Sequence, residues 1–92
     1  MIRSFRDKKT KRLFAEGSIR EFSSIRNRAE RKLVMLDSAT DLKDLLAPPG
    51  NRLEKLKSDR TGQHSIRITD QLRICLRWMT DGPHDVEITD YH

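Results

Sequence analysis

The spacing of the apolar residues changes from a helical period to a period of two near the middle of the chain. In the first part, four apolar residues recur at intervals of four, four and three: Ile25, Ala29, Leu33 and Leu36. Such a stripe predicts an amphipathic helix that faces a core, and Ser23 and Ser24 are candidates for its N-cap. The outer face of this helix is basic, which suits either solubility or contact with structured RNA.

Two shorter helices are predicted before and after this one. Asp7 is placed to cap a helix over residues 8–16, and Gly17 is placed to end it. Thr40 is a candidate cap for a helical turn over residues 41–47, whose three leucines we expect to pack inward. A Pro-Pro-Gly sequence then ends the helical part, because proline disfavours helix in the residue before it.

The remaining apolar residues alternate with polar ones and predict strands. We expect these strands at residues 1–5, 52–54, 64–69, 72–78 and 84–91. The connections are short, and an Asp-Gly pair at residues 81–82 indicates a hairpin, so neighbouring strands should pair antiparallel. The sequence therefore predicts one α+β domain over residues 1–92, with N-terminal helices packed on one face of a mostly antiparallel sheet.

The two faces of that sheet are expected to differ in chemistry. The alternation turns one set of residues towards the helices: Ile66, Ile68, Leu72, Ile74, Leu76, Trp78, Val86 and Ile88. It leaves the other face open, and that face should display Arg67, Arg73, Arg77 and Tyr91. A basic open face that carries an aromatic side chain suits a phosphate backbone and a stacked base.

Charge and composition narrow the class of partner. The chain has 92 residues and a formal net charge of +5, which favours an anionic partner. The single cysteine, Cys75, excludes a disulfide framework and fits a reducing cytoplasm. No stretch is apolar enough for a signal peptide or a membrane span, so we expect a cytoplasmic protein. One cysteine and three scattered histidines predict no metal site, and we expect no cofactor.

RNA can be cut without a metal when its own 2′-hydroxyl attacks the adjacent phosphate. The protein must then remove that proton, protonate the leaving 5′-oxygen and stabilise the charge on the phosphate. Candidate acid and base groups are Asp90, Tyr91, His92, Glu54 and His64. Candidate cations for the phosphate are Arg52, Lys55, Lys57, Arg60, Arg67, Arg73 and Arg77. Many small basic domains hold such a set, so the set alone does not identify a nuclease.

Each of these groups also has a structural interpretation. His92 is the last residue of the sequence, where chains often fray, and Tyr91 on a sheet face is commonly a packing residue. Asp90 has the phase of the core face, so the strand must bend out there or Asp90 must find a cationic partner. His64 is interpreted as a satisfied, half-buried histidine. Cys75 has no activating base in the sequence and is interpreted as a small sheet residue.

A resemblance extends over nearly the whole chain. It is carried, in collinear order, by Met1-Ile-Arg-Ser-Phe5, Arg31-Lys-Leu33 with Leu36-Asp37, Pro48-Pro-Gly-Asn-Arg-Leu53, Leu56-Lys-Ser-Asp-Arg60, His64-Ser-Ile66, Leu72-Arg-Ile74 and Asp90-Tyr-His92. These segments resemble HigB-type toxins of the RelE/ParE toxin–antitoxin superfamily, and the GraT-like branch in particular.

The resemblance implies a compact RelE/microbial-ribonuclease-like fold and a ribosome-dependent mRNA endonuclease that blocks translation. It also implies a HigA-like antitoxin with a helix-turn-helix DNA-binding domain, through which alone the toxin would reach operator DNA, and no membrane partner. By position, the active site would be Asp90, Tyr91 and His92 with Lys57 beside them, and Arg73 would contact phosphate.

One position departs from the family pattern, and two other functions stay open. Some HigB toxins have a catalytic histidine where this sequence has Glu54, a carboxylate that can act as a base or orient His92 but supplies no positive charge. The alternatives are a ParE-like toxin that targets gyrase and a non-catalytic module that binds ribosomal RNA or a protein. The Asp-Tyr-His ending argues against both, because neither needs an acid/base set.

Overall fold

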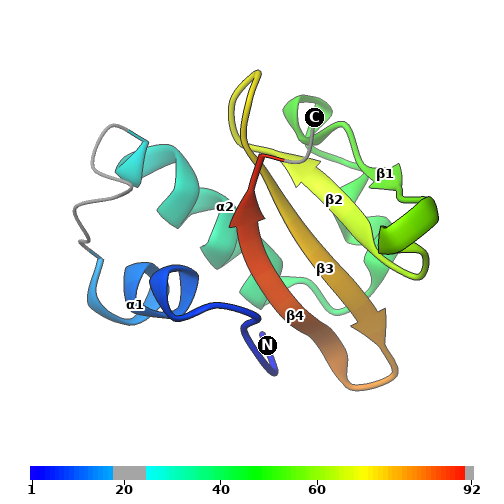
Figure 1. Ribbon diagram of the computed structural model, residues 1–92, viewed down its shortest axis with the longest axis horizontal. Helices are drawn as coiled ribbons and strands as arrows, with labels where there is room; N and C mark the ends of the chain where they lie inside the picture. The colour runs from blue at the N-terminus through cyan, green and yellow to red at the C-terminus, as the bar shows by residue number, and fades with distance from the viewer. Residues whose placement is uncertain (18–24, 91–92) are drawn as a thin grey trace.

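The computed structural model describes residues 1–17 and 25–90 of the chain. Its centre is an antiparallel sheet of four strands in sequence order: β1 (Glu54–Lys55), β2 (His64–Arg67), β3 (Arg73–Met79) and β4 (Gly82–Thr89). Two helices, α1 (Lys8–Glu16) and α2 (Arg26–Ser38), lie against one face of this sheet (Figure 1). The predicted α+β class and the pairing of neighbouring strands are therefore confirmed.

The register of the sheet fixes which residues share a face. Three buried isoleucines are aligned across β2, β3 and β4: Ile66, Ile74 and Ile88. One position nearer the β2–β3 turn, Arg67 pairs with Arg73, and Arg73 pairs with Thr89. Since successive side chains of a strand point to opposite faces, this second row lies on the outer face, away from the helices.

Helix α1 begins and ends where the sequence predicts. The side chain of Asp7 accepts a hydrogen bond from the Thr10 N–H, and Gly17 ends the helix in the left-handed conformation with φ 74°. Three residues of the predicted α2 stripe, Ala29, Leu33 and Leu36, are buried, and the fourth, Ile25, is partly buried at the N-cap position. The candidate caps Ser23 and Ser24 lie outside the described residues. No helix in residues 1–17 or 25–90 is long and apolar enough to cross a membrane.

The core lies between the two helices and the inner face of the sheet. Its fully buried apolar members include Leu13, Ala29, Leu33, Leu36, Leu45, Ile66, Ile74, Leu76 and Val86. Burial of a large aliphatic side chain stabilises a fold by roughly 1.5–3 kcal/mol, so this layer supplies much of the folding free energy. The helices thereby occupy the inner face, and the outer face is left for a site.

The helical turn after α2 is shorter than predicted and is capped by a different residue. It is a 3₁₀ helix over Leu42–Leu45, and Asp41 caps it in place of Thr40. Asp44 completes a reciprocal capping box, because its carboxylate accepts hydrogen bonds from the backbone N–H groups of Thr40 and Asp41. The helix ends at Leu45, and the next residue, Leu46, is 65% exposed instead of packed inward.

The N-terminal residues run beside β4 but form a single bridge, a parallel pairing of Phe5 with Val86. The predicted N-terminal strand is therefore wrong as a regular strand. Two features of the β4 edge interrupt it: Asp85 is left-handed, with φ 52°, and the Ile88 N–H donates to the Thr10 hydroxyl of α1. Helix α1 is thereby fastened to the last strand.

Candidate active site

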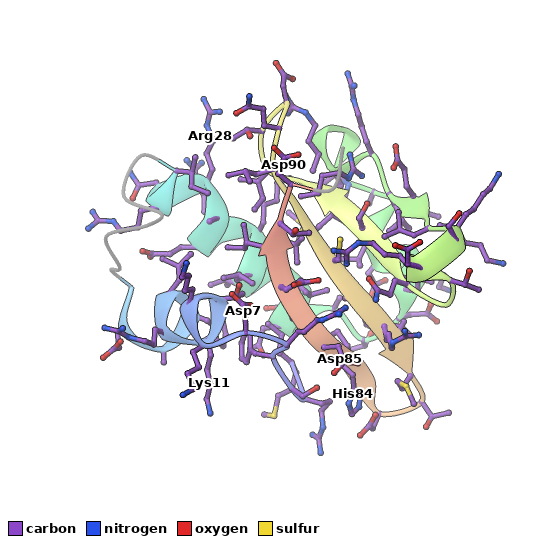
Figure 2. All side chains as sticks on the ribbon, in the orientation of Figure 1. Asp7, Lys11, Arg28, His84, Asp85 and Asp90 are labelled. Atoms are coloured by element: carbon purple, nitrogen blue, oxygen red, sulfur yellow. The ribbon has the colours of Figure 1, made fainter. Side chains whose placement is uncertain are left out.

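The outer face of the sheet carries, beside the β2–β3 turn, the aligned row Arg67, Arg73 and Thr89. Asp90 directly follows this row, lies beyond the end of β4 and is exposed (Figure 2). Because the strand ends there, Asp90 is not forced into the core that its phase would give it. Tyr91 and His92, the other members of the predicted set, lie outside the described residues.

Arg73 lies in the middle of this row, and its side chain packs flat against the outer face of the sheet. Only 7% of the residue is exposed. Its Nε donates to Ser65 Oγ at 2.7 Å, and its Nη2 donates to the carbonyl oxygens of Arg52 at 2.5 Å and Ser65 at 3.2 Å. The prediction that Arg73 is displayed on an open face is therefore wrong. The residue is on that face, but its guanidinium is a structural part of the sheet.

A sharp turn in the backbone brings Glu54 to Arg73. Arg52 adopts the left-handed conformation with φ 45°, so the predicted strand at residues 52–54 starts only at Glu54. Glu54 pairs with Ser65 in register, and its carboxylate lies 4.0 Å from Arg73 Nη2 with 55% of the side chain exposed. A carboxylate that faces solvent beside a buried guanidinium is available to take a proton or to orient one.

Lys57 is exposed in the loop that follows β1. A hollow of 340 Å³ beside it is lined by Lys57, Ser58, Asp59 and Arg60. The loop is fastened to β4, because the Arg60 guanidinium donates to Glu87 at 2.8 Å and to Gln63 at 3.1 Å. Arg60 therefore holds the Lys57 loop against the sheet, whereas the sequence predicts a cation that contacts phosphate.

The remaining predicted phosphate contacts are divided between the two ends of the sheet. Arg67 belongs to the row and is bound to Asp70 in the β2–β3 turn at 2.5 Å. Arg77 follows an irregularity in the β3–β4 pairing and lies 3.5 Å from Asp85, near the opposite end of β4 (Figure 2). Lys55 alternates to the other face of β1. The structure thus separates Lys55 and Arg77 from the row.

Cys75 and His64 lie in buried or partly buried positions within the sheet. Cys75 is fully buried between Ser65 and Glu87 on the outer face, and burial raises the pKa of its thiol to about 11. His64 is half-buried as predicted, and burial, followed by the charge of Lys55, lowers its pKa. Its Nδ1 is buried without a hydrogen-bond partner among the described residues, so the prediction of a satisfied histidine is wrong.

Ser65 and Glu87 help to build this site, and sequence reasoning missed both. Strand alternation already placed Glu87 outward, but its role depends on Arg60 arriving from the loop after β1. The small Ser65 side chain lets Arg73 lie across β2 and receives its Nε–H. The one signal in the sequence was that a small, outward-facing serine on β2 lies beside the strand that carries the outward-facing Arg73.

Comparison with known proteins places this architecture in a family. Residues 3–92 match the family described as "RelE-like toxin of type II toxin-antitoxin system HigB". The chain is 38% identical over 84 residues to Toxin HigB-1 of Vibrio cholerae serotype O1. This match covers 89% of this chain and 87% of that protein.

The structural comparison concerns the fold alone. The fold is similar to a chain of the YoeB–YefM complex from Staphylococcus aureus, with a TM-score of 0.63, 20% identity, and coverage of 100% of this chain and 98% of that one. This similarity confirms the predicted α+β fold. Since the family match spans nearly the whole sequence, the chain belongs to the HigB family of RelE-like toxins of type II toxin–antitoxin systems.

Proposed function

We propose that this toxin is a ribosome-dependent mRNA endonuclease that blocks translation. The observation that carries the proposal is the position of Asp90, exposed at the end of β4 beside the row that contains Arg67 and Arg73. The Asp-Tyr-His set therefore starts at the end of the sheet where guanidinium groups and the Glu54 carboxylate meet. Acid/base groups next to fixed positive charge are what cleavage of a phosphodiester requires.

In the proposed reaction the RNA supplies its own nucleophile. The 2′-oxygen attacks the adjacent phosphorus, the bond from phosphorus to the 5′-oxygen breaks, and the products are a 2′,3′-cyclic phosphate and a 5′-hydroxyl. His92 and Glu54 are the proposed proton-transfer groups, which take the 2′-proton and return one to the leaving oxygen. Asp90 orients His92 and favours its protonated form, because a neighbouring carboxylate stabilises an imidazolium.

The remaining residues position the RNA and its charge. Lys57, which is exposed, contacts the phosphoryl oxygens, and Tyr91 stacks on or positions a base of the cut codon. Arg73 adds positive charge from within the sheet, where a low dielectric strengthens it, and it holds the strand that bears Glu54. Arg67, which pairs with Arg73 in register, and Arg52, whose carbonyl oxygen accepts a hydrogen bond from Arg73, follow the RNA backbone in this proposal.

The proposed protein partner is a HigA-like antitoxin with a helix-turn-helix DNA-binding domain. The type II family supports an antitoxin partner, and the structurally similar chain was solved in a complex named YoeB–YefM. Operator DNA would be contacted through the antitoxin, and the toxin would act in the cytoplasm, where ribosomes are.

The test is to map the 5′ ends of a defined mRNA on purified ribosomes, with and without the protein. We expect new 5′ ends only when ribosomes and protein are both present. His92→Ala should lower the cleavage rate by roughly 10²–10⁴-fold, whereas His84→Ala, which changes a histidine at the opposite end of β4, should leave it unchanged (Figure 2). A His92→Ala rate within a few-fold of wild type contradicts the assignment.

The same mapping separates the two alternative functions. A gyrase-targeting toxin would leave the mRNA intact and cause DNA damage after induction. A non-catalytic module would bind ribosomes without producing new 5′ ends, and removal of Asp-Tyr-His would not change its effect.

A further inference from the structure

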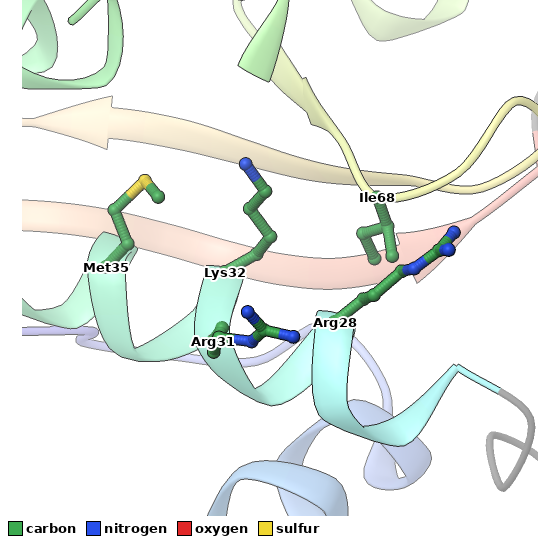
Figure 3. A pocket seen from close by; sticks show the side chains of 5 residues that line it. All are labelled: Arg28, Arg31, Lys32, Met35 and Ile68. Atoms are coloured by element: carbon green, nitrogen blue, oxygen red, sulfur yellow. The ribbon is translucent and has the colours of Figure 1, made fainter. Parts of the chain in front are cut away.

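The exposed surface of α2 carries two neighbouring hollows that share Arg31. One, of 490 Å³, is lined by Asn27, Glu30, Arg31 and Val34. The other, of 370 Å³, is lined by Arg28, Arg31, Lys32, Met35 and Ile68 (Figure 3). In the close view, the four labelled side chains of α2 follow one another along the helix. Ile68, the residue directly after β2, lies opposite them. The surface is therefore a shallow, two-part groove built on one helix.

This groove has more positive charge than the structure neutralises. Arg28 and Arg31 are exposed, and neither forms an ion pair within residues 1–17 and 25–90. Burial, followed by the charges of Arg67 and Arg31, lowers the pKa of Lys32. One carboxylate that lines the groove, Glu30, is paired with Arg26 at 3.7 Å. The pKa of Asp70 is lowered chiefly by its hydrogen bond from Arg67 and further by Arg52 and Arg28. Because both carboxylates are already engaged, the groove can take further negative charge.

The apolar part of the groove favours a protein over a nucleic acid. Its apolar walls are aliphatic or thioether side chains, namely Met35, Ile68 and Val34, and Val34 is 56% exposed. No aromatic residue is among the described residues that line either hollow, so these residues offer a base no ring on which to stack. Aliphatic and methionine side chains instead suit the side chains of a peptide.

We infer that this α2 groove binds an acidic, aliphatic-rich segment of a protein partner. Carboxylates of that segment contact Arg28, Arg31 and Lys32, and its aliphatic side chains enter the two hollows beside Val34 and Met35. The inference deepens the partner part of the proposed function and does not depend on RNA cleavage. It places inhibition or anchoring by the partner on the helix layer.

A binding measurement with the full chain tests this inference. The probe is a fluorescent synthetic peptide of alternating glutamate and leucine, followed by anisotropy at physiological ionic strength. The double variant Arg28→Gln/Arg31→Gln should weaken binding by about tenfold or more, since each charge-assisted contact that is lost lowers the affinity several-fold. The matched control, Lys8→Gln/Lys11→Gln, removes the same charge from exposed positions on α1 (Figure 2 labels Lys11) and should leave the affinity nearly unchanged.

Three further outcomes decide the proposal. Val34→Asp, a change at an exposed position, should also weaken the peptide by several-fold, because it places a carboxylate in the apolar part of the groove. Equal losses in the groove variant and in the α1 control would overturn the inference, since binding would then follow net charge. Displacement of the peptide by a short single-stranded RNA of similar affinity would also overturn it and assign the groove to nucleic acid. Wild-type peptide binding with no cleavage on ribosomes would leave this inference standing while the proposed catalysis failed.

Discussion

The outer face of the sheet and the exposed surface of α2 are both rich in arginine, but the sheet pairs its arginines within the fold, whereas α2 leaves two of its described arginines without an ion pair. On the sheet and its loops, Arg73 is bonded to Ser65 and to the Arg52 carbonyl, and ion pairs join Arg60 to Glu87, Arg67 to Asp70 and Arg77 to Asp85. On α2, Arg28 and Arg31 have no such carboxylate partner among the described residues, and Arg26 alone pairs along the helix, with Glu30 at 3.7 Å.

The difference follows from the geometry of the two elements. A strand and its neighbours bring residues from distant parts of the chain side by side, so an arginine can find a carboxylate or a carbonyl oxygen there. On a helix surface the neighbours are three and four residues away, and for Arg28 these are Arg31 and Lys32, which have the same charge. The comparison teaches that positive charge on the sheet holds the fold, whereas positive charge on α2 is kept at a cost to the helix and is available to a partner.

The largest expected loss of stability comes from Arg73. Arg73→Met should lower the free energy of unfolding by about 1.5–3 kcal/mol, because it leaves the Ser65 hydroxyl and the Arg52 carbonyl without their charged donor. Urea denaturation measures the change. Arg73→Lys, which keeps the charge but not the planar fork of donors, should lose less. An Arg73→Met protein as stable as wild type would show that the guanidinium does not hold the sheet.

A smaller loss is expected at Glu87. Glu87→Gln removes the charge that faces Arg60 and Arg6 while it keeps the shape, and it should cost about 1 kcal/mol, because the carboxylate is only 14% exposed. The matched control is Asp85→Asn, whose partner Arg77 and own side chain are both more exposed. Its cost should be smaller. Equal costs in the two variants would mean that burial does not strengthen the Glu87 pair.

The smallest effect, and one of opposite sign, is expected on α2. Arg28→Glu should stabilise the protein by about 0.5 kcal/mol, because it places a negative charge in the first turn and opposite Lys32 four residues later. The same change should abolish binding of the glutamate–leucine peptide. Thermal or urea denaturation gives the first quantity and anisotropy the second. A destabilised Arg28→Glu variant would remove the contrast between the two surfaces.

Local signals in the sequence predicted most of the elements. Asp7 and Gly17 bound α1 as expected, and the apolar stripe of α2 is buried, because caps and helical period act between residues close in the chain. The hairpin between β3 and β4 is confirmed for the same reason, although its turn lies at residues 80–81 and Gly82, already in β4, pairs with Met79. One error arose where two neighbouring residues could both cap the same turn. Asp41 capped the 3₁₀ turn in place of Thr40 because Asp44 completed its capping box.

By itself, the sequence determined the α+β class, the core face of the helices and strands, the overall excess of positive charge, and the family. Only the tertiary structure decided which of the many cations are available. Arg73 is hydrogen-bonded to Ser65 and Arg60 is paired with Glu87. Arg28 and Arg31, by contrast, are exposed. The physical reason is that the pairing of a charge depends on groups brought together by sheet register and loop path. Alternation along one strand specifies a face, but not the side chains that arrive on it from elsewhere in the chain.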